Sequence, residues 1–194
     1  GLIFLRDLES LSYDDDETSS YLETKKTGEY NVPYIPTPYY FLYLIKKNLL
    51  ASGIKKINLI DIGCGYCRPA KYLSKKFDLN FSGIELSKDI TKKVMDEKNI
   101  NFKIYNFNLR DKKKTKSFFK NNLKKNISNV IIISDTVEIN QINKVFKSLD
   151  NHNKIVVIFI NVKYKKFKNK KFKIRKKILF KQNSRNIIFY NNYN

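Results

Sequence analysis

Histidine, cysteine and long apolar stretches are all scarce in this sequence of 194 residues. No apolar run reaches the roughly 18 residues that a membrane-spanning helix needs. The chain does not open on a basic segment followed by an apolar stretch and a small-residue cleavage site, so we expect no secretory signal. We therefore predict a cytoplasmic protein with no membrane span. The first residue, Gly1, leaves open an organelle location reached after removal of a leader.

The only two cysteines, Cys64 and Cys67, lie three positions apart, and His152 is the only histidine. A Cys-x-x-Cys motif can form a redox pair or half of a zinc site. The sequence has no second pair of cysteines or histidines to complete such a zinc site. We interpret the two thiols as small side chains that line a turn, and we predict no metal site.

The net charge of +21 has two explanations. Lysine outnumbers arginine 34 to 5, and lysine has A/T-rich codons, so mutational bias in an AT-rich genome accounts for a basic protein. Bias explains the distribution of charge less well, because residues 1–30 carry eight acids and three bases, whereas residues 151–194 carry thirteen bases and no acid. A basic C-terminal region favours a weakly bound RNA or another acidic partner.

The densest basic segment is Lys163–Lys177, where lysines alternate with Tyr164, Phe167 and Phe172. This pattern is compatible with phosphate contacts combined with base stacking. The alternative is a solvated basic rim whose aromatic side chains point into the core.

Strand and helix patterns alternate along most of the chain. A helix is predicted to start at Thr37, with its hydroxyl as cap and Pro38 in the first turn, and to end at Gly53. Strands are then expected at about 57–62, 80–85, 101–107, 129–134 and 154–161, with helices at about 68–77, 87–98, 113–125 and 138–149. Such alternation predicts a parallel sheet covered on both faces.

The last part of the chain breaks this alternation. Residues 171–181 and 186–191 resemble two strands with no helix between them, which predicts an antiparallel hairpin at one edge of the sheet. We expect residues 1–29 to form an acidic N-terminal arm and residues 30–194 to form a single domain.

A glycine-rich turn follows the first predicted strand, in the segment INLIDIGCGYCRP at residues 57–69. Gly63 and Gly65 allow positive φ angles and a close approach of backbone N–H groups to a ligand at a helix N-terminus. Glu85 ends the next strand, 22 residues after Gly63. A right-handed β-α-β unit brings such an acid beside the turn, where it can bind ribose hydroxyls. The segment therefore predicts a site for a nucleoside cofactor.

These features resemble the Rossmann-like, class I S-adenosylmethionine-dependent methyltransferases. The segments YIPTPYYFLYLIKKNLL, LIDIGCGYCRPAKYLS, FSGIELS and NFNLRD are similar to the motifs Y-x-P-T-x-Y, D-x-G-C-G-K-G-R, G-x-E-L-S and D-x-R-D of a bacterial group with a D-x-G-C-G turn. The resemblance covers about Tyr30 to Tyr190. It implies an α/β fold, a Rossmann-like three-layer sandwich around a mostly parallel seven-stranded sheet with a C-terminal antiparallel hairpin.

The resemblance also implies a binding site for S-adenosyl-L-methionine. Glu85 would take both ribose hydroxyls, and the methionine part would face Asp61, Gly63, Cys64 and Gly65. These residues are the glycine turn, the acid at the end of the first strand and the acid at the end of the second.

Four further positions extend this expected site. Leu86, together with Ile84, would flank the adenine, although a core role fits equally well. Asn108 stands where the family usually has an aspartate that accepts from the adenine amino group. Ser134 ends the fourth strand beside the cofactor, and Tyr34, like Tyr39, would belong to a lid over it.

The chain departs from the family pattern twice. Cys67 replaces the third glycine of the turn, and Ser134-Asp135-Thr136 replaces the Asn-Pro-Phe type of motif after the fourth strand. Asp135 is the candidate catalytic carboxylate, which would orient or deprotonate the methyl acceptor. Its alternative role is to cap the following helix.

Two functions remain after these comparisons of motifs. The first is a methyltransferase that acts on an unidentified acceptor. The second is a methyltransferase fold that has lost catalysis and serves as a basic RNA-binding or assembly component. A nicotinamide-dependent dehydrogenase is disfavoured, because the chain shows no substrate domain and no histidine other than His152 for proton transfer.

Overall fold

The computed structural model describes residues 36–97, 102–134, 154–161, 169–180 and 185–193, and the single positions 142, 143, 145, 146, 149 and 167. The predicted acidic arm 1–29 lies outside the described residues, as do Tyr34, Asp135 and most of the helix expected at 138–149. No helix among the described residues combines the length and the apolar character needed to cross a membrane.

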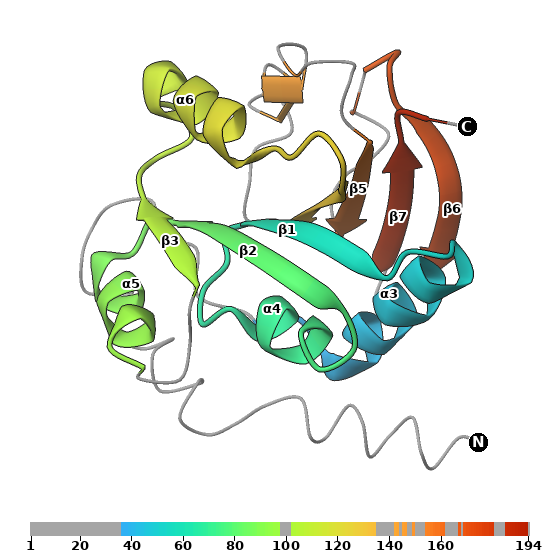
Figure 1. Ribbon diagram of the computed structural model, residues 1–194, viewed down its shortest axis with the longest axis horizontal. Coiled ribbons are helices and arrows are strands. Elements are labelled where there is room, and N and C mark those ends of the chain that lie inside the picture. The colour runs from blue at the N-terminus through green and yellow to red at the C-terminus, as the bar shows by residue number, and fades with distance from the viewer. Residues whose placement is uncertain are drawn as a thin grey trace.

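The described strands form one seven-stranded sheet with the order β3-β2-β1-β4-β5-β7-β6. Their bounds are β1 Lys56–Ile62, β2 Asp78–Glu85, β3 Lys103–Asn106, β4 Ser128–Ser134, β5 Ile155–Ile160, β6 Lys173–Leu179 and β7 Asn186–Asn191. Strands β1 to β5 pair in parallel, whereas β7 pairs antiparallel with both β5 and β6. The predicted parallel sheet and its terminal antiparallel hairpin are therefore confirmed (Figure 1).

Helices cover both faces of the sheet. Helices α3 (Tyr39–Ala51), α4 (Arg68–Leu73) and α5 (Lys88–Met95) lie on one face, and α6 (Lys112–Asn122) lies on the other (Figure 1). Side chains alternate along each strand, so Leu59 packs with the three-helix face and its neighbour Ile60 packs with the α6 face. The result is the expected three-layer sandwich.

Helix α3 starts one residue later than the sequence predicts. Pro38, with a ψ of 139°, occupies the N-cap position, and no side chain caps the helix. The predicted Thr37 cap is therefore wrong, because the extended Pro38 places Tyr39 at the first helical position. The predicted end is confirmed, since Gly53 follows the helix with a φ of 71°.

Two aromatic side chains of the basic segment, those of Phe167 and Phe172, turn into the core. Phe172 is buried, and the ring of Phe167 lies 5.0 Å from the rings of Phe159 and Tyr190. Base stacking by Phe167 and Phe172 is therefore wrong, because both rings complete the apolar cluster on the α6 face. Tyr164 lies outside the described residues.

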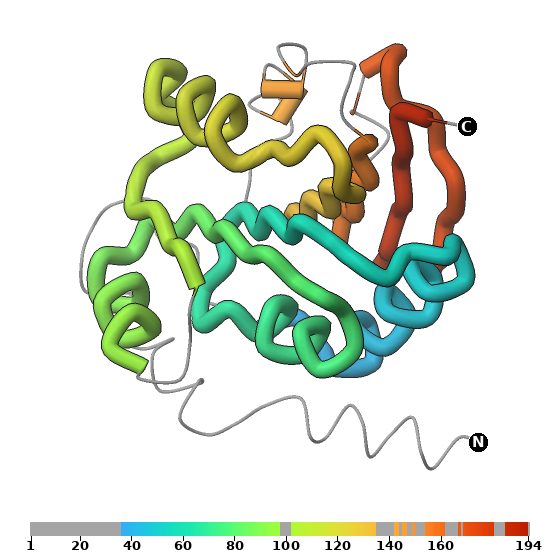
Figure 2. The backbone as a smooth tube through the Cα atoms, in the orientation of Figure 1, coloured from blue at the N-terminus to red at the C-terminus, as the bar shows by residue number. Residues whose placement is uncertain are grey.

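A network of buried amides joins the end of α6 to the start of β1 and β4. The amide nitrogen Nδ2 of Asn58 donates to Oδ1 of Asn129 and to the carbonyl of Asn122, both at 2.8 Å. The hydroxyl of Ser82 donates to Oδ1 of Asn122, also at 2.8 Å. The chain leaves α6 and runs directly into β4 (Figure 2). The network fixes α6 against the amino ends of the parallel strands.

Candidate functional site

The turn after β1 contains three left-handed residues within five positions. Gly63, Gly65 and Cys67 have φ angles of 76°, 50° and 59°. The N–H groups of Gly63 and Cys64 donate to the carbonyl of Ile84 at 2.8 and 3.1 Å. The turn is thereby fastened to the end of β2, as the β-α-β topology predicts.

Glu85 bridges this turn and helix α5. Its Oε2 accepts from the N–H of Gly65 at 2.8 Å, and its Oε1 accepts from the N–H of Ser87 at 2.8 Å. Each carboxylate oxygen has two lone pairs, so each can accept one further hydrogen bond. The half-buried Glu85 thus combines a fixed position with spare acceptor capacity.

The backbone N–H groups of the turn serve the protein itself. Those of Gly63, Cys64 and Gly65 donate to the end of β2, and that of Cys67 donates to the carbonyl of Cys64 at 2.8 Å. This differs from the expectation that the turn would present its N–H groups to a ligand. The turn gathers the carboxylates of Asp61, at the end of β1, and Glu85, at the end of β2.

Asp61 is the more perturbed of these two carboxylates. It is buried, and its Oδ2 has no hydrogen-bond partner among the described residues. Burial, and then the charge of Glu85, raise its pKa to about 7. Alternation along the strands puts Asp61 and Glu85 on the same face, because Asp61 pairs with Gly83 and Glu85 follows two positions later. A cationic group beside Asp61 would lower its pKa again, because an opposite charge favours the ionised carboxylate.

The two cysteines pack inside the turn as small side chains. Both are buried and unbridged, and a side-chain hydrogen bond with Cys67, followed by burial, holds the pKa of the Cys64 thiol well above its usual value. A thiol of raised pKa is a poor nucleophile, which disfavours the redox alternative. A Cβ added to Gly83 would lie 2.6 Å from the sulfur of Cys64, so β2 needs a glycine there. The sequence pattern did not single out Gly83.

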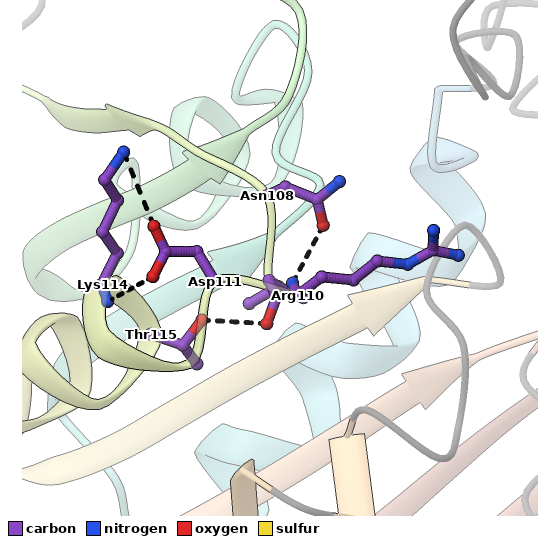
Figure 3. A network of polar contacts seen from close by, with 6 residues as sticks. Asn108, Arg110, Asp111, Lys114 and Thr115 are labelled. Atoms are coloured by element: carbon purple, nitrogen blue, oxygen red, sulfur yellow. Dashed lines mark hydrogen bonds and ion pairs between the residues drawn. The ribbon is translucent and has the colours of Figure 1, made fainter.

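The loop from β3 to α6 is held by local hydrogen bonds (Figure 3). Oδ1 of Asn108 accepts from the N–H of Arg110 at 2.9 Å, while its amide nitrogen points away from that bond. Asp111 caps α6 by accepting from the N–H of Lys114 at 3.0 Å. One lone pair of the Asn108 oxygen therefore remains for the expected adenine contact.

Asn106 is a second residue that sequence reasoning missed. Its Nδ2 donates to the carbonyls of Glu85 and Leu86 at 3.0 and 2.8 Å, which fixes the chain just beyond β2. Leu86 is 42% exposed there, whereas Ile84 is buried in the core. Ile84 thus fills its expected core role, and Leu86 remains the apolar side chain available at this edge.

The other expected positions divide into two groups. Ser134 ends β4 and pairs with Ile160, at the same carboxyl edge of the sheet as Gly63, Glu85 and Asn108. Asp135 and Tyr34 lie outside the described residues.

Tyr39, the other expected lid residue, lies in α3. Its ring is 4.9 Å from the guanidinium of Arg68 and 5.8 Å from the ring of Tyr72. Arg68 is 3% exposed and follows the glycine turn directly, a burial that its sequence position did not indicate. Tyr39 therefore packs on helix α4.

No protein-family model matches the sequence, and a search of the curated proteins gives no match. Solved structures do match. TrmK of M. capricolum, in complex with S-adenosyl-homocysteine, is 16% identical with a TM-score of 0.54, over 80% of this chain and 68% of that one. An S-adenosylmethionine-dependent methyltransferase from Clostridium acetobutylicum is 10% identical with a TM-score of 0.56, over 92% of this chain and 99% of that one. An RNA methyltransferase from Salinibacter ruber, in complex with S-adenosyl-L-homocysteine, is 13% identical with a TM-score of 0.53, over 81% of this chain and 93% of that one.

The sheet order, the two helical layers and these likenesses define the fold class. The chain has the Rossmann-like fold of class I methyltransferases, with its C-terminal antiparallel strands in place. At these identities the likeness is one of fold, so function has to be argued from the site.

Proposed function

We propose that this protein is an S-adenosylmethionine-dependent methyltransferase. The observation that carries the proposal is the pair of carboxylates, Asp61 and Glu85, at the left-handed turn between β1 and α4. The neighbours crystallised with S-adenosyl-homocysteine have the same fold, which supports this cofactor for the present chain.

The residues fit the cofactor's polar groups. The unpartnered Oδ2 of Asp61 suits the ammonium of the methionine part, a cation that would favour the ionised carboxylate. Glu85 keeps one lone pair on each oxygen, as two ribose hydroxyls require. Leu86 and Asn108 then flank and bind the adenine, and Gly63, Cys64, Gly65 and Ser134 line the remaining edge.

When bound, the cofactor supplies a methyl group on a positively charged sulfur. The protein's part is to hold an acceptor in line with that methyl group, because such transfers depend on position more than on covalent catalysis. Asp135, directly after Ser134, is the candidate to orient the acceptor or take its proton. Tyr34 is a candidate contact above the cofactor.

A second candidate function is a fold that keeps its shape without catalysis. Cys67 adopts a φ of 59°, a conformation that glycine takes at much lower cost, and the motif after β4 reads Ser134-Asp135-Thr136. Such a protein would act as a basic RNA-binding or assembly component, with Lys163–Lys177 as a weak phosphate-binding segment.

Calorimetric titration with S-adenosyl-homocysteine tests the proposal. We expect a dissociation constant in the micromolar range for the wild type and no measurable heat for Glu85→Ala at the same concentrations. No binding by the wild-type protein would contradict the methyltransferase and favour the second candidate.

A further inference from the structure

Helix α6 exposes a row of lysines. Its sequence KKKTKSFFKNN contains no acid, and its buried side consists of Thr115, Phe118, Phe119 and Asn122. Lys112, Lys116 and Lys120 are exposed and four positions apart, so they form one line along the helix with a spacing of about 6 Å. We refer to these three residues as the α6 lysine row.

Helix α6 has no acid among its own residues, whereas α5 on the opposite face contains Asp89 and is followed by Asp96. On the three-helix side, Lys71 pairs with Glu97 at 2.9 Å. At the amino edge of the sheet, Lys56 pairs with Asp78 at 2.7 Å. On α6 the described residues provide one ion pair, Lys114 with Asp111 at 3.7 Å, which does not involve the row. Like charges four apart weaken a helix, so the row is not explained by helix stability.

The row stands on a fixed support. Asp111 caps the start of α6, and Asn122 fastens its last turn to Asn58 and Ser82 through the buried amide network. Phe118 and Phe119 anchor α6 in the apolar cluster on its face of the sheet. The three ammonium groups therefore project from a backbone that does not have to order before binding.

One end of the row lies at the same edge of the sheet as the proposed site. Helix α6 begins four residues after Asn108, at the carboxyl edge of β3, and extends from there toward the amino ends of the strands. A strand of phosphates along the row would therefore have one end at the edge that carries Glu85 and the glycine turn.

We propose that the α6 lysine row binds the phosphates of an RNA strand, and that RNA is the class of methyl acceptor. RNA as the methyl acceptor rests on the proposed methyltransferase function, whereas RNA binding by the row does not depend on it. A regular line of point charges suits evenly spaced phosphates. A membrane surface is disfavoured, because the outward side of α6 carries Ser117 and Asn121 next to the row, with no apolar side chain to insert into lipid.

The test compares two triple variants of the full chain. The first is Lys112→Gln/Lys116→Gln/Lys120→Gln. The matched control, Lys75→Gln/Lys76→Gln/Lys92→Gln, removes the same charge from exposed positions on the three-helix face. Glutamine keeps helix propensity, and circular dichroism verifies that both variants fold.

The probe is a fluorescent oligouridylate of about 20 nucleotides, titrated at about 50 and about 200 mM KCl. We expect the row variant to lose at least about tenfold in affinity at the lower salt and to reduce the salt slope by about 2, at about 0.7 per lost contact to a single strand. The control should stay within about twofold to threefold, the effect of net charge alone. Equal losses in both variants would overturn the surface, and so would row-dependent binding to phosphatidylserine vesicles without row-dependent binding to RNA.

Titration with S-adenosyl-homocysteine separates this inference from the proposed function. We expect both triple variants to bind it as the wild type does, since neither touches Asp61 or Glu85. Row-dependent RNA binding without cofactor binding would overturn RNA as a methyl acceptor and keep the surface. Cofactor binding with RNA binding indifferent to the row would overturn the surface and keep the proposed function.

Discussion

The buried polar groups near the two ends of strand β1 are in opposite situations. Toward the amino end, Asn58, Asn122 and Asn129, together with Ser82 from the middle of β2, satisfy one another and nearby carbonyls with hydrogen bonds of about 2.8 Å. At the carboxyl end, one oxygen of Asp61 has no hydrogen-bond partner among the described residues, and Glu85 lies nearby.

We interpret the amide network as a contribution to stability and the carboxyl end as the part adapted to binding. Neutral amides whose bonds are complete contribute to folding, because none of them has to be desolvated without compensation. A buried carboxyl without a partner costs stability, and the cost is recovered when a cation or donor binds. The predictions below change one end and measure both properties.

The largest effect is expected for Glu85→Ala. Loss of two charge-assisted hydrogen bonds should weaken binding of S-adenosyl-homocysteine by at least about 100-fold. Because the N–H groups of Gly65 and Ser87 lose their acceptor, unfolding should also become easier by about 1–2 kcal/mol. Calorimetry and urea unfolding measure the two effects. Affinity within threefold of the wild type would remove Glu85 from the site.

Asn129→Ala tests the opposite end. Asn129 is fully buried, and its side chain bonds Asn58, Lys124 and Lys154. Removing it leaves several buried groups without partners, so we expect a loss of about 2–4 kcal/mol in urea unfolding. Affinity for S-adenosyl-homocysteine should stay within about twofold for the fraction that is folded. A large change in affinity at constant stability would contradict the separation of the two ends.

Asp61→Asn should trade binding for stability. Burial, and then the charge of Glu85, raise the pKa of Asp61 to about 7 in the folded protein, so protonation of Asp61 favours folding. That contribution is complete below the unfolded pKa and is lost as the pH rises from about 4 through about 7. At pH 8 the asparagine variant should therefore be more stable than the wild type by about 2 kcal/mol, with the difference shrinking toward pH 5.

The same variant should bind S-adenosyl-homocysteine about tenfold more weakly at pH 8, because an amide does not pair with the ammonium of the methionine part. The wild type should itself bind more weakly below about pH 7, where Asp61 becomes protonated. Stability that is indifferent to the substitution at pH 8 would show that the folded protein does not raise the pKa of Asp61.

The smallest effect is expected for Cys67→Gly. Glycine relieves a left-handed conformation that costs a non-glycine residue about 1 kcal/mol, while loss of a buried thiol offsets part of that gain. We expect a change in unfolding free energy of less than about 1 kcal/mol and a gain in affinity of up to about threefold. Cys67→Ala, which removes the thiol but keeps the Cβ, is the matched control and should show no gain.

The sequence by itself determined the order of strands and helices, the glycine turn and the placement of Glu85 next to it. These features follow from local rules: apolar alternation, positive φ at Gly63 and Gly65, and the right-handed crossover that brings β2 beside β1. The terminal hairpin was predictable for the same reason, because no helix pattern separates β6 from β7.

Only the tertiary structure decided how these residues are used. The N–H groups of Gly63, Cys64 and Gly65 donate to Ile84 and Glu85 and not to a ligand. Phe167 and Phe172 pack in the core and do not line a basic surface. The pKa of Asp61 likewise depends on its burial and on the nearby charge of Glu85. Burial and hydrogen-bond partners come from segments far apart in the chain. Spacing along the sequence therefore specifies the strand or turn on which a residue lies, but not which side chains surround it.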